Sequence, residues 1–128
     1  MIRFMSLLAV LAVAAPAVAA DRKVRVLVWD EQQPKQKEAY PDFLGNRIAE
    51  YLRKDADLEV TSANLGRPEQ GLSDQAIDEA DVLIWWGHVR HNDVDDKRVA
   101  RIVARVKEGR LGLVCLHSAH YTGGDDGR

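Results

Sequence analysis

All four histidines of the chain fall in two His-x-x-His pairs. The first pair is His88 and His91, and the second pair is His117 and His120. Each pair directly follows an apolar run that is typical of a buried strand. Neutral imidazole binds zinc, nickel, copper or iron well, and it also exchanges protons near neutral pH. The spacing therefore predicts one functional polar site, with loop histidines bonded to the backbone as the structural alternative.

Two acidic residues, Asp30 and Glu31, end a third apolar run. The carboxyl ends of parallel strands open on one edge of a sheet, so we expect four imidazoles and two carboxylates to converge from three loops. One interpretation is a divalent metal, zinc first, bound by all four histidines with carboxylates completing the shell. The other interpretation is general acid and base catalysis by the same groups.

Four further residues near this edge each have two interpretations. Ser118 lies within the second histidine pair and is a hydroxyl nucleophile or a substrate contact. Arg90 contacts a hydroxyl-rich or anionic ligand, or is simply solvated. Cys115 lies inside an apolar strand and lacks the flanking glycines of a nucleophile elbow, which predicts a buried structural thiol. Trp29 stacks on a sugar ring or, as we expect, packs in the core.

Apolar runs typical of strands alternate with helical periodicity along the chain. Strands are predicted over residues 23–29, 58–61, 82–86 and 113–116. Apolar residues at helical spacing predict helices around 43–52 and 99–106, with a short helix within 74–81. This alternation predicts an α/β fold with a parallel sheet between helices. Right-handed crossovers then predict a flavodoxin-like, doubly wound strand order.

The first twenty residues have the order of a secretory signal. Arg3 supplies the positive charge, residues 6–15 are small or apolar, Pro16 breaks the run, and residues 17–20 suit a signal peptidase. We therefore expect residues 1–20 to be a signal peptide and the mature protein to be exported, to the periplasm or outside the cell. An uncleaved anchor is the alternative, but the apolar run is shorter than the about 20 residues of a membrane span, so we expect no stable membrane insertion.

Removal of residues 1–20 takes away Arg3 and no acid, which leaves 17 bases, 20 acids and a net charge of −3. This interspersed, mildly acidic balance argues against nucleic acid as a partner. We expect one α/β domain over 21–122 and a disordered tail over 123–128. Only twelve polar and glycine-rich residues follow Leu116, so about four strands are present and the carboxyl half is expected to be missing. A small four-stranded domain is the alternative.

Several sequence strings resemble ThuA-like proteins of trehalose utilisation, a branch of the class I glutamine amidotransferase-like superfamily. The most specific are Trp-Trp-Gly-His at 85–88 and Leu-His-Ser-Ala-His at 116–120, and the similarity extends over residues 23–121. The resemblance implies a flavodoxin-like sandwich. It also implies a small-molecule carbohydrate partner, namely trehalose or a related disaccharide handled through oxidised keto-sugars.

Two departures from the family pattern limit what the resemblance implies. Gly45 stands where family members usually carry a histidine, which weakens a metal site built on that residue. Members are also considerably longer, and amidotransferase relatives draw catalytic partners from the carboxyl half. Amidotransferase activity is therefore not predicted.

Three functions remain open from the sequence. The first is a carbohydrate-metabolising enzyme, with His117, His120 and Ser118 as catalytic residues. In it, Arg90 binds substrate, and Asp30 and Glu31 bind sugar hydroxyls or orient the histidines. The second is a non-catalytic exported sugar-binding module that uses the same edge. The third is an inactive fragment. A homo-oligomer is compatible with each of them.

Overall fold

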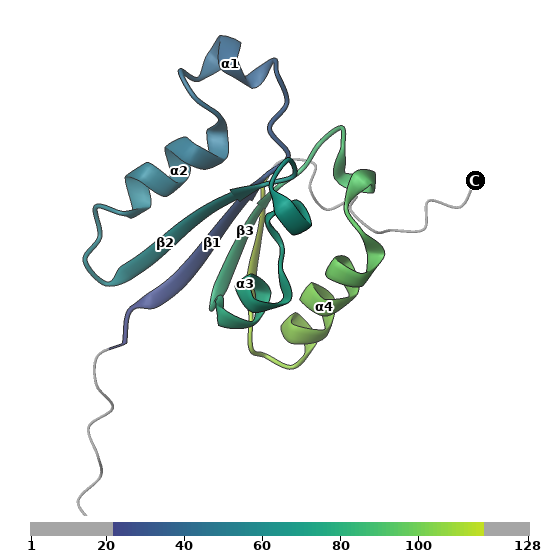
Figure 1. Cartoon of the computed structure of the whole chain (residues 1–128). Coiled ribbons are helices and arrows are strands. Elements are labelled where there is room, and N and C mark those ends of the chain that lie inside the picture. Colours follow the sequence, from purple (N-terminus) through teal and green to yellow (C-terminus); the bar gives the residue numbers. More distant parts are fainter. Residues whose placement is uncertain (1–21, 117–128) are drawn as a thin grey trace, which may run out of the picture.

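A computed structural model describes residues 22–116, which form a four-stranded parallel sheet between two layers of helices (Figure 1). The strands are β1 (Val24–Asp30), β2 (Leu58–Asn64), β3 (Val82–Trp86) and β4 (Gly112–Leu116). Their order in the sheet is β2-β1-β3-β4, as in a flavodoxin-like doubly wound fold. The predicted fold class is confirmed. The expected signal peptide (1–20) and tail (123–128) lie outside the described residues.

The helices lie on both faces of the sheet, as Figure 1 shows. One face carries α2 (Leu44–Leu52), with the short α1 (Gln36–Ala39) beyond the strand ends, and the other face carries α3 (Asp74–Glu79) and α4 (Asp96–Lys107). Two 3-10 turns, η1 (Pro68–Gly71) and η2 (His91–Asp93), follow β2 and β3. Within 22–116, none of the helices has both the length and the apolar character needed to cross a bilayer.

Polar side chains fix the start of the two helices on the α3–α4 face. The Ser73 hydroxyl accepts a hydrogen bond from the Ala76 amide at 3.1 Å, which caps α3. The Asp95 carboxylate accepts one from the Lys97 amide at 2.8 Å, which caps α4. The acidic stretch before α4 is thus a helix start.

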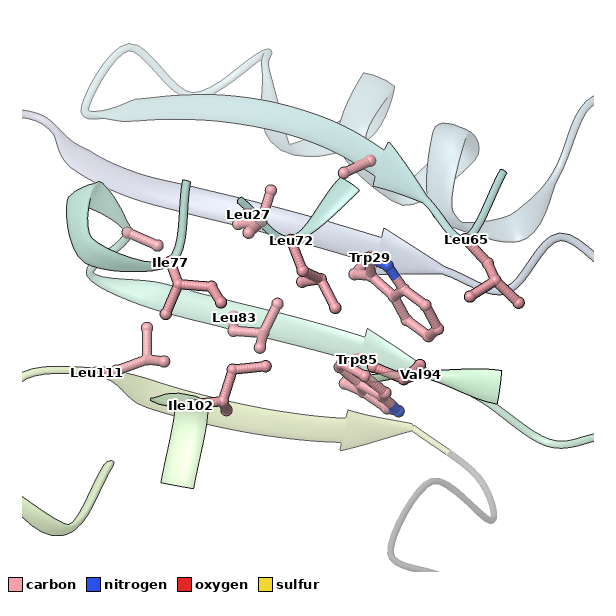
Figure 2. Close-up of a cluster of buried hydrophobic side chains, with 12 residues drawn as sticks. Leu27, Trp29, Leu65, Leu72, Ile77, Leu83, Trp85, Val94, Ile102 and Leu111 are labelled. Atoms are coloured by element: carbon pink, nitrogen blue, oxygen red, sulfur yellow. The ribbon is translucent and has the colours of Figure 1, made fainter. Parts of the chain in front are cut away.

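The larger part of the core lies between the sheet and the α3–α4 layer (Figure 2). Trp29 and Trp85 are register partners on β1 and β3, and their rings stack with centroids 4.0 Å apart. Trp29 is fully buried, and its Nε1 donates to the Gln70 carbonyl at 2.8 Å. The expectation that Trp29 packs in the core is therefore confirmed. Trp86 points to the opposite face, as strand alternation requires.

The α2 face has a smaller core, and it is covered mainly over β1 and β2. Val26 and Val28 of β1 are buried there against Ala49 of α2. On β4, by contrast, Leu113 and Val114 are 42% and 45% exposed. Cys115 is exposed too, so the prediction of a buried structural thiol is wrong: β4 is an edge strand, and the described elements leave it largely open.

Partial burial nonetheless raises the pKa of the Cys115 thiol. A nucleophilic or metal-binding cysteine needs the opposite shift, because the thiolate is the reactive form. The structure therefore gives Cys115 none of the activation expected of a nucleophile.

Candidate functional site

The carboxyl ends of β1 and β3 form the topological switch point of the sheet. These strands are neighbours, and the chain leaves β1 toward β2 on one side and β3 toward β4 on the other. Asp30 pairs in register with Trp86, so Glu31 and the loop that begins at Gly87 lie side by side. Ligands of doubly wound folds bind at this point. We call the whole line of strand ends the carboxyl edge.

Glu31 is the centre of the switch point and is only 1% exposed. Its Oε2 accepts hydrogen bonds from the amides of His88 at 2.8 Å and Arg90 at 2.9 Å. Its Oε1 accepts from the Val89 amide at 2.9 Å and from the side-chain amide of Gln33. Three consecutive backbone amides thus wrap one buried carboxylate. This arrangement fixes the backbone that carries the first histidine pair.

The electrostatics of Glu31 reflect two opposing effects. Burial penalises the charged form and acts to raise the pKa of the carboxyl. The hydrogen bonds from the Val89 amide, the Gln33 side chain and the amides of His88 and Arg90 outweigh that penalty, and they hold the pKa of Glu31 below its usual value. The group is therefore an anion at neutral pH, and its oxygens are already engaged by donors.

Asp30 is equally buried, but it accepts hydrogen bonds from groups on the α2 side of the carboxyl edge. Its Oδ2 accepts from the Gly45 amide at 2.7 Å, and its Oδ1 accepts from the Gln36 side chain at 3.0 Å and the Gln32 amide at 2.6 Å. Gln36 in turn accepts from the Leu44 amide at 3.0 Å. Asp30 therefore anchors the first turn of α2 to the end of β1.

This contact explains the glycine at position 45. A Cβ on Gly45 would lie 2.6 Å from the Cβ of Asp30, a distance that real structures do not tolerate. A histidine, like any residue with a Cβ, does not fit the present backbone at this position. Gly45 contributes a backbone amide instead of a side chain.

The first histidine pair and Arg90 lie on the loop that Glu31 holds. His88 is exposed, and its ring is tilted against Trp86 at 6.5 Å. His91 begins η2 and is half-buried, and its Nδ1 is buried without a hydrogen-bond partner among residues 22–116. Arg90 is exposed and pairs with Asp93 at 2.9 Å. The two imidazoles are thus presented by one constrained segment.

At Gly87 the loop packs closely against the core. A Cβ there would lie 3.0 Å from Nε1 of Trp85 and 3.3 Å from the Cβ of His91. Nε1 of Trp85 is buried and, within the described part of the chain, has no hydrogen-bond partner. Glycine at 87 therefore lets the loop close over the tryptophan pair.

The second histidine pair follows the neighbouring strand end. Leu116 is the last described residue, and it pairs in register with Trp86. His117, Ser118 and His120 lie outside the described residues. The structure brings Asp30, Glu31, His88, His91 and Arg90 to one edge. That the second pair joins them stays a prediction.

The described residues restrict where a metal could bind. Each carboxylate oxygen of Asp30 and Glu31 already accepts a hydrogen bond from an amide donor. Across 22–116, no group of three histidine, cysteine or acidic residues is placed to hold a metal. His88 and His91 alone supply two imidazole ligands. A metal centre here depends on His117 and His120.

Sequence reasoning missed the polar groups that complete this edge. Gln33, Gln36 and Gly45 bind the two carboxylates, and Gln70 bridges to the chain before α4 by donating to the Asp93 carbonyl at 2.7 Å. The glutamine-rich run after β1 is the one signal that pointed to them. Their spacing is irregular, so it matches no motif.

No protein-family model matches the chain, and no curated protein matches it significantly. The likeness to ThuA-like proteins therefore rests on the sequence strings.

Proposed function

We propose that this chain carries the ligand-binding edge of an exported ThuA-like domain that acts on a disaccharide or keto-sugar in trehalose-type carbohydrate utilisation. One observation carries the proposal: the loop with the first histidine pair is held at the switch point by the buried Glu31 carboxylate. Burying a charge is costly unless it is fully hydrogen-bonded. A buried anion that orders a polar loop indicates that the position of this loop is important for binding a ligand.

The residues take distinct roles in this proposal. His88, His91 and Arg90 offer imidazole and guanidinium donors to substrate hydroxyls from the ordered loop. His117 and His120 act as acid and base on a sugar carbonyl or glycosidic oxygen, and Ser118 contacts the substrate. Asp30 and Glu31 are positioning residues, because their oxygens are engaged by protein amides.

A metal version of the proposal uses the same residues. Here His88, His91, His117 and His120 hold a divalent ion, zinc first, which when bound polarises a substrate oxygen. The imidazole donor set fits zinc. The carboxylates stay outside the shell and orient the loops.

The second candidate is a sugar-binding module without catalysis. Both buried carboxylates already accept hydrogen bonds from backbone amides, so neither is available as a general base. Among residues 22–116, only the imidazoles then remain to accept a proton at the switch point, which favours a module without catalysis. An inactive fragment is the third candidate. It is distinguished from the others by failure of the full chain to unfold cooperatively.

Turnover of a 3-keto-disaccharide by the full chain, followed by NMR, tests the proposal. We expect His117→Ala to lower the rate by about 100-fold or more, as loss of a general acid or base does. Lys107→Ala, at the end of α4 away from the carboxyl edge, is the control and should leave the rate unchanged. Binding without turnover supports the module, and absence of both contradicts the carbohydrate function.

Elemental analysis of the purified chain after incubation with zinc tests the metal version. A stoichiometric ion that is lost in His88→Ala would support it. No bound metal after reconstitution would remove it and leave the acid–base version.

A further inference from the structure

A second polar groove lies at the carboxyl edge, on the far side of β1 from the 87–91 loop. Its volume is about 600 Å³, and its lining includes Gln32, Asp42, Phe43, Asn46, Asn64 and Arg67. The groove runs between α2 and the second half of β2, because Glu50, Arg53 and Ser62 line it as well. Asn64 is the register partner of Asp30, so the groove opens beside the anchored end of β1. We call it the α2–β2 groove.

The inner wall of the groove is pre-ordered by a relay of side chains. The Ser62 hydroxyl donates to the side-chain oxygen Oδ1 of Asn46 at 2.6 Å, and the side-chain NH₂ of Asn46 donates to Asp42 at 2.8 Å. Asn64 accepts from the Gly66 amide at 3.0 Å through Oδ1, which fixes its amide group, and its NH₂ has no hydrogen-bond partner among residues 22–116. The wall therefore presents oriented donors and acceptors.

The side chains of two other lining residues, Arg67 and Gln32, make no hydrogen bond or ion pair with residues 22–116. Arg67 is exposed. Gln32 has a backbone φ of 56°, in the left-handed region that non-glycine residues rarely adopt, and its amide is held there by Asp30 at 2.6 Å. Strained backbone of this kind gathers at ligand-binding positions.

The charge of the lining identifies the class of ligand. Asp42 and Glu50 balance Arg53 and Arg67, so the formal charge of the groove is zero. A phosphorylated ligand would need excess positive charge, and a cation would need excess carboxylate. Hydroxyl groups both donate and accept, which suits the mixture of amide, hydroxyl and charged groups here.

The volume of the groove and its one aromatic side chain also favour a hydroxylated ligand. Phe43 adds one ring to an otherwise polar lining, and a ring packs against the apolar face of a cyclic molecule. The volume falls within the range of about 300 to 1,000 Å³ that is typical of small-molecule sites.

We infer that the α2–β2 groove binds a neutral polyhydroxylated molecule of about disaccharide size. This inference does not rest on the function proposed for the switch point, because no residue of the 87–91 loop lines the groove. Arg67 and Asn64 supply its free donors, and Asp42 supplies its acceptor.

Titration of the full chain with trehalose, followed by two-dimensional NMR, tests the inference. We expect the side-chain amide signals of Gln32, Asn46 and Asn64 to shift, and Arg67→Ala to weaken binding about tenfold through loss of a charged donor. Arg110→Ala is the matched control, because Arg110 is an exposed arginine outside the groove, and it should bind as the wild type does.

Three outcomes would overturn the inference: no shift at the highest trehalose concentration, shifts confined to the 87–91 loop, or competition by inorganic phosphate. Unchanged thermal unfolding of Arg67→Ala establishes that the variant is folded. Keto-sugar turnover is measured separately, so a failure of the groove and a failure of the switch-point function are distinguishable.

Discussion

The two sides of the carboxyl edge use adjacent buried carboxylates in different ways. On the α2 side, Asp30 binds groups that follow within fifteen residues, namely Gln32, Gln36 and Gly45. On the β3 side, Glu31 binds the amides of a loop that lies 57 to 59 residues away. One carboxylate joins a strand to its own crossover helix, and the other joins two neighbouring strand ends.

The surroundings of the hydrogen bonds differ as well. The bonds from Gly45 and Gln36 to Asp30 are buried, whereas those from the loop to Glu31 are partly buried. A buried donor that loses its acceptor keeps its full desolvation penalty, but a partly exposed donor can bind water instead. Asp30 should therefore govern stability, and Glu31 should govern the order of the loop that carries the candidate site.

Asp30→Asn is expected to have the largest effect on stability. The variant loses the charge and turns an NH₂ group toward one of its three donors, so the free energy of unfolding should fall by about 3 kcal/mol. Chemical denaturation measures this loss. Glu59→Gln, at an exposed carboxylate on β2, is the control, and it should change stability by less than about 0.5 kcal/mol. If Asp30→Asn lowers the free energy of unfolding by less than Glu31→Gln does, then Asp30 does not govern stability.

Gly45→Ala tests the same contact from the α2 side. The added Cβ would lie 2.6 Å from the Cβ of Asp30, so α2 has to move away from β1, and we expect a loss of about 2 kcal/mol. Gly112→Ala on β4 is the matched control, because its Cβ would meet the nearest atom at 3.5 Å. Equal stability of the two variants would show that Asp30 does not hold α2 tightly.

The sequence predicted the parts of this edge that depend on local pattern. Apolar runs marked all four strands, although β2 continues to Asn64, three residues past its expected end. The polar residues after β1 and β3 marked the edge itself, because strands of one parallel sheet end on the same side. Asp30 and Glu31 were therefore placed correctly at the carboxyl edge.

The partners of those carboxylates were not predictable in the same way. Hydrogen bonds from the amides of His88 and Gly45 depend on how loops fold against each other, and backbone amides carry no residue signature. The exposure of Cys115 was missed for a related reason. An apolar run indicates a strand, but it does not say which neighbouring elements cover that strand.

Acidification should remove the stabilisation that the Glu31 anion gives to the folded state. Its pKa is below the usual value when folded and about 4.3 when unfolded, so the folded state favours the anion. The stabilisation it gives is complete above the unfolded pKa, and it is lost as the pH falls through the lower, folded pKa. At neutral pH we expect Glu31→Gln to lower the free energy of unfolding by about 1.5 kcal/mol.

The difference in stability between wild type and Glu31→Gln isolates this group from other acids with lowered pKa values, such as Asp81 beside Arg22. That difference should shrink toward zero as the pH falls, and the amide signals of His88, Val89 and Arg90 in the wild type should titrate below the usual glutamate pKa. A difference that stays constant on acidification, or a titration at or above the usual value, would mean that the loop is not held by the Glu31 anion. In that case, the first histidine pair would lose the support that distinguishes the β3 side from the α2 side.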